Sequence, residues 1–373
     1  MPKQVRHDRE NNSSPMLTSE QQAITSILIQ ATQYRASDVH LLPGSPPVFR
    51  VDGKLTTVSQ ETIISADLLQ NYVETILTPA QRERLEKDRD VRLTVTLENK
   101  LRFRLVAQYQ KGNLALDMRY IPAAIPTIAE LGLPAAVETF SRSTHGFVLI
   151  IGPYGSGRST TLAAMLQAIN LKRAAHVVTI ERPIEFLYAS EKSIVEQREV
   201  GVDVESVAHG IAMADREDVD VLVIGELDGQ DGMRACVQAI HSGRLVIATF
   251  DADSSVQAIE LLVNAFPTAE QPWARKHLAE SLVGILNQRL VPRLGGGRVL
   301  VSGVLTPSTG LRALIRDGQF LQLSNAIQTA REEGTVSLDR ALAEFVRNGD
   351  IQLADAEAVA VDAANLRAIT TRE

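Results

Sequence analysis

The residues best suited to chemistry form a glycine-rich run between an apolar stretch and a helix-forming one. Residues 147–161 read FVLIIGPYGSGRSTT, and LAAMLQAIN follows. Closely spaced glycines allow consecutive backbone N–H groups to turn inward and surround phosphate oxygens. The N-terminus of the following helix adds a partial positive charge. The pattern therefore predicts a nucleotide-binding phosphate loop made of Gly152, Pro153, Tyr154, Gly155, Ser156, Gly157, Arg158, Ser159 and Thr160.

This loop departs from the P-loop pattern GxxxxGK[ST] at one position, where Arg158 replaces the lysine. The positive charge remains, but a planar fork with five donors replaces a compact ammonium group. Ser159 stands where the hydroxyl of the pattern would hold Mg²⁺. A glycine-rich turn of purely structural origin is the alternative interpretation of the loop alone. The strand–loop–helix context favours the P-loop.

Two glutamates come at the ends of apolar stretches. Glu226 ends VLVIGE, and Glu181 follows a β-forming run in TIERPIEF. In open α/β sheets, ligands bind in the crevice outside the carboxyl ends of the strands. Both carboxylates are therefore expected to face a ligand crevice, and the alternative is a pair of acidic surface residues at strand ends.

Apolar strands that alternate with helical segments are expected to position these residues. We predict the strands at 147–152, 176–181, 219–225 and 244–250. Such alternation is typical of a largely parallel sheet covered by helices. From about residue 308 the pattern predicts helices only. The sequence therefore predicts an α/β domain with a helical C-terminal part over 135–350 and a helical or tail segment over 351–373.

A smaller α+β domain is predicted over residues 16–120. Its first helix is expected to begin at Thr18, which can form a capping box with Gln21, and to end near Tyr34. Asp52-Gly53 predicts a hairpin tip. Further helices are expected at about 66–77 and after Pro79, and strands at 91–97, 101–109 and 114–120.

Composition limits the class of protein further. The 373 residues carry a net charge of −7, which argues against a protein whose main role is to coat nucleic acid. A single cysteine, Cys236, excludes an intrachain disulfide and a four-cysteine zinc site. No apolar run approaches the about 20 residues that a transmembrane helix needs, so we expect a soluble protein. Polar residues 1–15 predict a disordered tail, and the proline-rich residues 121–134 predict a linker.

From about residue 16 to about residue 350, ordered motifs resemble those of the type IV pilus retraction ATPases, a PilT/PilU-like family within the type II/IV secretion ATPases. The matching segments are RASDVHL, FRVDGKL, IPTIAELGLP, GPYGSGRSTTLAAML, TIERPIEF, QREVG, DREDVDVLVIGEL, GLRALIRDGQ and SNAIQTAREEGTVSLDRALAEFV. The resemblance implies a PAS-like N-terminal domain, a RecA-like P-loop NTPase domain, a hexameric ring, and ATP bound between the two domains. It also implies that Arg102, Arg104 and Arg119 act as arginine sensors of the nucleotide.

The chain departs from the family pattern within the motifs that carry chemistry. Arg158 replaces the lysine, and Arg182 stands where the acidic motif reads E-D-P. After Glu226 the family usually has an Arg-Asp pair, where this chain has Asp228-Gly229. The two histidines of the family align with Arg244 and Asp251. Because phosphoryl transfer depends on positioning and charge stabilisation, these changes predict ATP binding with weakened hydrolysis.

The resemblance implies a ring subunit of the motor for twitching motility, with Glu226 and Glu181 as its catalytic carboxylates, and ATP and Mg²⁺ as cofactors. The alternative is a pseudo-ATPase that joins or regulates an active paralogue, so whether the chain hydrolyses ATP stays open. Expected partners are further copies or a paralogue in a hexamer and an inner-membrane pilus platform protein, with no direct nucleic-acid contact and no membrane insertion. The implied location is the cytoplasm, at the inner membrane. A four-cysteine zinc motif, common in the pilus extension branch, is absent from the sequence.

Overall fold

The computed structural model describes residues 18–58, 62–97, 100–329 and 334–371, so the predicted tail at 1–15 lies outside the described residues. By their contacts, the described residues divide into two compact units. The first comprises Met1–Val91 and Leu105–Arg119, and the second comprises Arg92–Arg104 and Tyr120–Glu373. The hairpin segment 92–104 therefore belongs to the second unit, although its strands begin and end in the first.

The N-terminal sheet has six strands in the order β3-β2-β1-β6-β5-β4. Thr18 caps the first helix in a capping box with Gln21, and Asp52 and Gly53 connect β2 to β3, as predicted. The predicted strands at 91–97, 101–109 and 114–120 are confirmed as β4, β5 and β6. The helices are α1 (Ser19–Gln33), α2 (Ala66–Ile76) and α3 (Pro79–Asp88), and the strands are β1 (Asp38–Leu41), β2 (Val48–Val51), β3 (Lys54–Thr57), β4 (Asp90–Thr96), β5 (Arg102–Gln110) and β6 (Asn113–Ile121).

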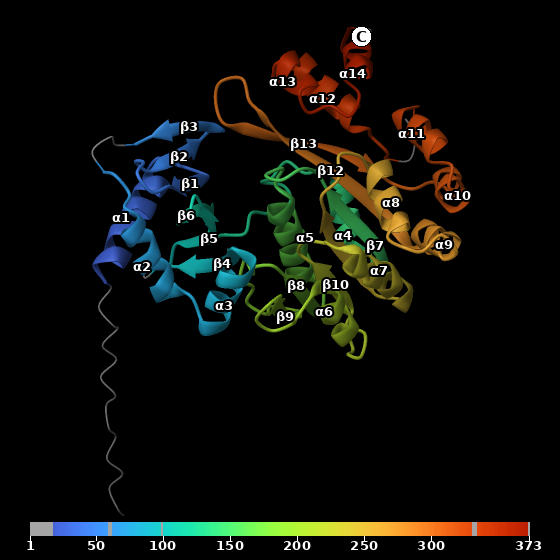
Figure 1. Ribbon diagram of the computed structural model, residues 1–373. Helices are drawn as coiled ribbons and strands as arrows, with labels where there is room; N and C mark the ends of the chain where they lie inside the picture. The colour runs from blue at the N-terminus through green and yellow to red at the C-terminus, as the bar shows by residue number, and fades with distance from the viewer. Residues whose placement is uncertain (1–17, 59–61, 98–99, 330–333, 372–373) are drawn as a thin grey trace, which may run out of the picture. The chain divides into compact units, whose positions relative to one another are not determined.

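The second unit is built on a seven-stranded sheet in the order β13-β12-β7-β11-β10-β8-β9 (Figure 1). Six neighbouring strands, from β12 to β9, pair in parallel, and β13 pairs antiparallel with β12. The prediction of a largely parallel sheet is confirmed. The strands are β7 (Gly146–Ile151), β8 (His176–Glu181), β9 (Ile194–Glu199), β10 (Val221–Ile224), β11 (Leu245–Phe250), β12 (Leu282–Pro292) and β13 (Arg298–Leu305).

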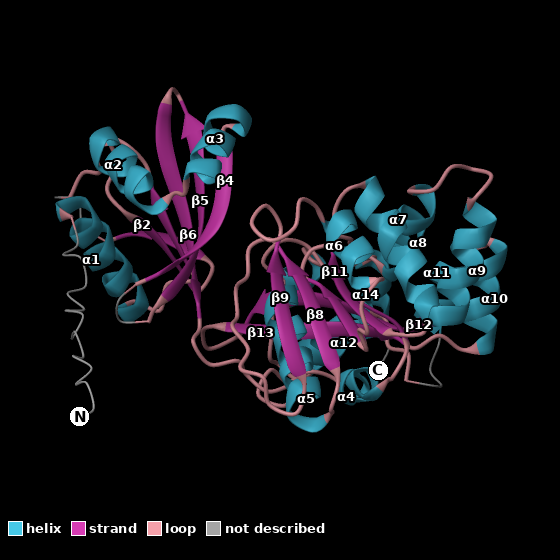
Figure 2. Cartoon of the chain, turned by 90° about the horizontal axis from the view of Figure 1, so that it is seen from below, coloured by secondary structure: helices cyan, strands magenta, loops and turns pink. Residues whose placement is uncertain are grey.

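Helices cover both faces of this sheet because the central strands are apolar on both sides. Along β7, Phe147, Leu149 and Ile151 face a core that includes α6, α7, α8 and α9. Val148 and Ile150 face α4 and α5 on the other side. Figure 2 shows these cyan helices beside the magenta strands. The helices are α4 (Ala135–Arg142), α5 (Arg158–Lys172), α6 (Val207–Ala214), α7 (Gln230–Ala239), α8 (Ser255–Asn264) and α9 (Gln271–Ser281), with a 3₁₀ turn at Ile240–Ser242.

The C-terminal part is helical, as predicted, and α12 and α14 pack together in a separate apolar cluster. Buried Asp339 accepts hydrogen bonds from the backbone N–H groups of Val361 and Asp362, which fixes the start of α14 to α12. Cys236 is fully buried on α7, as expected of a small apolar residue. No helix in the described part of the chain combines the length and apolarity that crossing a membrane requires. The helices are α10 (Thr309–Asp317), α11 (Phe320–Thr329), α12 (Leu338–Arg347), α13 (Leu353–Glu357) and α14 (Ala363–Thr371).

Candidate nucleotide-binding site

The predicted phosphate loop connects the end of β7 to the start of α5. Gly152, Gly155 and Gly157 have φ angles of +149°, +81° and +92°, in the region that favours glycine. A Cβ on Gly152 would lie 2.5 Å from the carbonyl oxygen of Gln288 and 2.7 Å from Oγ of Ser156. The close approach of β12 to this turn therefore requires glycine at position 152.

The N-terminus of α5 is open to a ligand. Gly157 occupies the cap position, and no described side chain caps the helix there. The first N–H groups of the helix are therefore not capped by a side chain, and the positive end of the helix dipole lies there, which suits an anion. Ser156, beside this helix end, is only 3% exposed, and its Oγ has no hydrogen-bond partner among the described residues. Both features fit a phosphate group.

Arg158, the residue in place of the lysine, is buried beside an acidic residue. Its side chain is 9% exposed, and its Nη2 lies 4.0 Å from Oδ2 of the exposed Asp251. Its Nη1 is buried and lacks a hydrogen-bond partner within the described chain. Burial lowers the pKa of Arg158, while the charges of Asp251 and Glu226 oppose this effect. The Arg158 guanidinium nevertheless stays protonated, because arginine stays charged in proteins.

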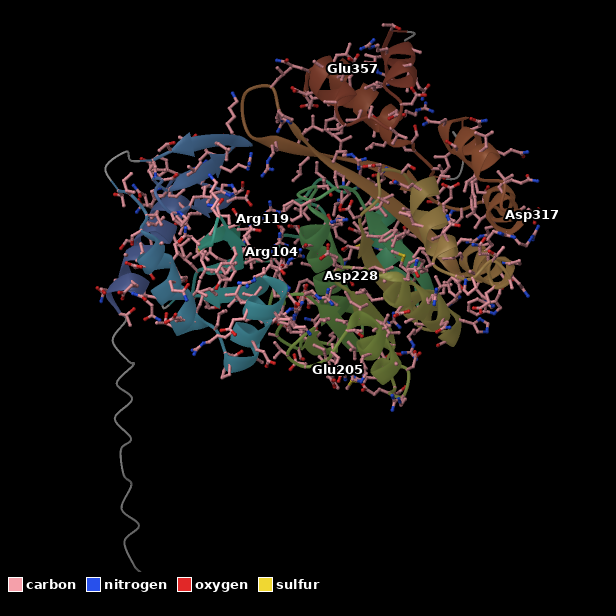
Figure 3. All side chains as sticks on the ribbon, viewed as in Figure 1. Arg104, Arg119, Glu205, Asp228, Asp317 and Glu357 are labelled. Carbon is pink, nitrogen blue, oxygen red and sulfur yellow. The ribbon has the colours of Figure 1, made fainter. Side chains whose placement is uncertain are left out.

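Two of the three predicted arginine sensors, Arg102 and Arg104, belong to the second unit, and Arg104 contacts the phosphate loop. Arg104 is labelled in Figure 3. Its Nη1 donates to Oε1 of Glu185 at 2.7 Å, and its Nη2 donates to the hydroxyl of Tyr154. The guanidinium carbon of Arg104 also lies 5.3 Å from the centre of the Tyr154 ring. Nη2 of Arg102 donates to the carbonyl of Ile184 at 3.3 Å. Arg104 is thus hydrogen-bonded to Tyr154, a residue of the phosphate loop.

Arg119, the third predicted sensor, lies on β6 in the first unit. Its Nε donates to Oδ1 of Asp38 at 2.8 Å. Burial opposes ionisation of Asp38, but the hydrogen bond and charge of Arg119 outweigh it and lower the pKa of that carboxyl. Arg119 and Asp38 thus form an ion pair within the first unit.

Glu181 is the last residue of β8 and Glu226 follows the adjacent parallel strand β10, so both lie at the same edge of the sheet. Oε1 of Glu181 accepts hydrogen bonds from Thr179 Oγ1 at 2.7 Å and Gln197 Nε2 at 3.0 Å. Burial nevertheless raises the pKa of Glu181 to about 7. The Glu226 carboxylate is more exposed, and its Oε2 lies 3.9 Å from Nη1 of Arg92.

The residues at which the chain departs from the family pattern lie in different parts of the second unit. Arg182 and Asp228 form an ion pair, with Nη1 2.7 Å from Oδ2. The positive charge expected to unbalance the acidic motif is therefore offset. Asp251 follows β11 at the edge that holds the phosphate loop. Arg244 precedes the same strand, bonds to the carbonyl of Ala214 at 3.0 Å, and does not join the site.

Sequence reasoning missed a buried polar segment of β12 beneath the site. Nε2 of Gln288 donates to Oγ1 of Thr161 at 2.8 Å, and both residues are fully buried. Nη1 of Arg289 donates to the carbonyl of Gln288, and its Nη2 donates to the carbonyl of Asp253. The available signal was the triplet Asn287-Gln288-Arg289 within an otherwise apolar strand, because polar residues in such a place need buried partners.

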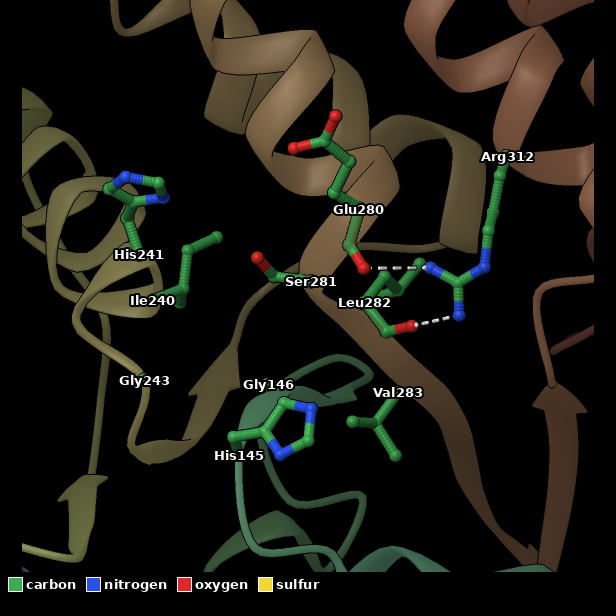
Figure 4. Close-up of a pocket in the computed structure, with 10 residues that line it drawn as sticks. All are labelled: His145, Gly146, Ile240, His241, Gly243, Glu280, Ser281, Leu282, Val283 and Arg312. Atoms are coloured by element: carbon green, nitrogen blue, oxygen red, sulfur yellow. Dashed lines mark hydrogen bonds between the residues drawn. The ribbon is translucent and has the colours of Figure 1, made fainter.

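A separate cavity of about 390 Å³ lies at the opposite end of β7 (Figure 4). There Arg312 donates hydrogen bonds to the carbonyls of Glu280 and Leu282, so its guanidinium is held by the backbone between α9 and β12. His241 lines this cavity, and its ring centre lies 4.3 Å from that of His277. None of the predicted site residues lines the cavity.

A parallel α/β sheet with a glycine-rich loop leading into an uncapped helix defines a P-loop nucleotide-binding protein. The family model for type II/IV secretion system proteins matches residues 16–298. The type IV pilus retraction ATPase PilT of Pseudomonas aeruginosa is 34% identical, over 87% of this chain and 94% of that protein. The type IV pilus ATPase PilU of the same organism is 32% identical, over 89% and 87%. The chain therefore belongs to the type II/IV secretion system protein family, among its PilT/PilU-like retraction ATPases.

The structural comparison agrees with this assignment. A crystal structure of the pilus retraction motor PilT with bound ADP superposes with a TM-score of 0.80 at 34% identity, over 95% of this chain and 100% of that one. The ATPase DotB of Legionella pneumophila shares the fold, with a TM-score of 0.77 at 21% identity, over 93% and 97%. The predicted fold class, a RecA-like P-loop domain with a small PAS-like domain, is confirmed.

Proposed function

We propose that this protein is a subunit of a type IV pilus retraction motor that binds ATP at its phosphate loop and hydrolyses it slowly. The observation that carries the proposal is the open N-terminus of α5 beside the unpartnered hydroxyl of Ser156. Similarity to PilT, whose crystal structure has bound ADP, supports a nucleotide as the ligand. The whole predicted loop, from Gly152 to Thr160, is the proposed binding segment, with Ser159 as the candidate side chain toward Mg²⁺.

Slow hydrolysis follows from the groups around the proposed catalytic carboxylates. Glu226 is the candidate that positions the attacking water, and Arg92 lies 3.9 Å from it. Glu181 is the second candidate, and with a pKa of about 7 it is only partly ionised at neutral pH. Arg102, Arg104 and Arg119 are proposed to sense the nucleotide. Since catalysis of phosphoryl transfer is mostly positioning and charge stabilisation, such changes act on turnover more than on binding.

The relatives supply the proposed setting. Because PilT is named as a pilus retraction ATPase, we propose that this chain works in twitching motility as part of a hexameric ring. The ring would contain further copies or a paralogous ATPase, and would act in the cytoplasm against an inner-membrane platform protein of the pilus.

A second candidate function is a pseudo-ATPase that binds nucleotide and regulates an active paralogue. The observation that favours it is the burial of Arg158 beside Asp251, because that ion pair stands where the family has a lysine and a histidine. This candidate predicts nucleotide binding and ring assembly with no turnover by the chain alone.

Steady-state ATP turnover with Mg²⁺ separates the two candidates. The purified protein is compared with Glu226→Gln and Arg158→Lys, and nucleotide binding is measured on the same samples. Slow turnover that disappears in Glu226→Gln supports the motor. Binding without turnover supports the pseudo-ATPase. Absence of both binding and turnover contradicts the proposed function altogether.

A further inference from the structure

The phosphate site contains buried positive charge that the protein compensates poorly. Arg158 is buried, its Nη1 has no hydrogen-bond partner in the described chain, and its nearest carboxylate is 4.0 Å from Nη2. That carboxylate belongs to Asp251, whose side chain is 65% exposed and thus largely hydrated. A buried guanidinium normally has its donors satisfied. The free donors of Arg158 therefore mark a place for an anion.

A second buried group points to the same ligand. The hydroxyl of Ser156 is buried without a described partner, and it lies within the loop that leads into the uncapped end of α5. A phosphate group accepts hydrogen bonds from hydroxyls, backbone N–H groups and guanidinium groups alike. The loop thus contains three kinds of donor that suit a phosphate group.

The carboxylates near this loop are poor ligands for Mg²⁺, which is usually held by one or two carboxylates together with the phosphates of the substrate. Asp228 is bonded to Arg182, Asp251 faces Arg158, and Glu226 faces Arg92. Glu181 accepts two hydrogen bonds, and its burial favours the neutral acid. No group of three or more metal-binding side chains occurs among the described residues. The residues present do not fit a carboxylate-supported magnesium site.

We propose that this site binds the phosphates of a nucleoside di- or triphosphate with Arg158 in the place of a divalent cation, so that affinity does not depend on Mg²⁺. The inference rests on the proposed function, since it concerns the same site. Arg158 supplies a fixed charge and bidentate donors to the phosphate. Asp251 is the counter-ion that the phosphate must displace, so the two anions compete for one guanidinium.

The test measures binding of ATP and ADP by isothermal titration, once in excess Mg²⁺ and once in EDTA. We expect dissociation constants within about threefold of each other. A loss of affinity of about tenfold or more in EDTA overturns the inference but leaves nucleotide binding intact. Absence of binding in both buffers contradicts the proposed function as well, so the two failures are distinguishable.

Variants test whether Arg158 is the group that makes phosphate binding independent of Mg²⁺. Arg158→Lys is expected to bind about tenfold more weakly in EDTA and to regain affinity with Mg²⁺, because an ammonium group has fewer donors. Asp251→Asn is expected to bind ATP more tightly in both buffers, and weaker binding would contradict the competition. Arg293→Lys is the control, because Arg293 is an exposed residue paired with Asp350 at the end of β12. Thermal unfolding of each variant verifies that it is folded.

Discussion

The guanidinium of Arg182 donates a 2.7 Å hydrogen bond to the carboxylate of Asp228, joining the segments that follow the adjacent strands β8 and β10. At these two positions the family pattern has a carboxylate and an arginine, respectively. The chain therefore has the charges of the pair in reversed order. Two departures that look like separate losses in the sequence are one exchange in the structure, and the net charge of the pair is unchanged.

This exchange predicts that the two positions depend on each other. Arg182→Asp places two carboxylates together, and Asp228→Arg places two guanidinium groups together, so each single variant should be less stable. The double variant should recover most of the loss. Because both side chains are partly exposed, we expect a coupling energy of about 0.5–1 kcal/mol. Urea unfolding of the four proteins measures it, and strictly additive effects would show that the pair does not interact.

A second prediction concerns the turn of the phosphate loop. In Gly152→Ala the added Cβ meets the Gln288 carbonyl at 2.5 Å, and the φ of +149° is unfavourable as well. The loop must shift, so we expect nucleotide affinity to fall by about tenfold or more.

Gly295→Ala is the matched control for this change. Gly295 also has a positive φ, +95°, but nothing lies within 4 Å of its Cβ position. The control therefore carries the backbone strain without the collision. Equal losses of affinity in the two variants would contradict the role assigned to Gly152.

Periodic and local features were predictable from the sequence. The capping box of Thr18 and Gln21, the hairpin tip at Asp52-Gly53 and the parallel strands all follow from short-range patterns. Contacts between distant segments were not predictable in this way. The pairing of Arg158 with Asp251 and of Arg182 with Asp228 depends on which strand ends meet, and strand order is a property of the folded sheet.

Glu181 leads to a prediction about pH. Burial raises its pKa in the folded protein to about 7, whereas the unfolded chain ionises near the usual value of 4.5. Between these values the folded state holds a proton that the unfolded state has released. The contribution of Glu181 to stability is thus fully present below about pH 4.5 and is lost as pH rises through about 7.

Glu181→Gln tests this prediction because the amide stays neutral. The free energy of unfolding of the variant minus that of the parent should rise from about pH 5 to about pH 8, by about 3 kcal/mol at most. Urea unfolding across this range measures the difference. The same difference in free energy of unfolding is measured for Glu199→Gln as a comparison, because burial also raises the pKa of the Glu199 carboxyl. A pH-independent difference for Glu181→Gln would mean that the carboxyl ionises normally.

The last prediction concerns the buried hydrogen bond between Gln288 Nε2 and Thr161 Oγ1, 2.8 Å long, which fixes β12 to the first turns of α5. Oε1 of Gln288 already lacks a partner among the described residues. Thr161→Val removes the only described acceptor of the Gln288 amide and leaves its N–H buried without a partner. We therefore expect the free energy of unfolding to fall by about 1–3 kcal/mol.

Gln288→Leu instead leaves the Thr161 hydroxyl buried without its donor and should lower the free energy of unfolding by a similar amount. The double variant replaces both polar groups by apolar ones and should be more stable than the sum of the singles implies. If the bond also fixes the phosphate loop, nucleotide affinity should fall in the double variant even where stability recovers, because β12 then no longer holds α5 at one position.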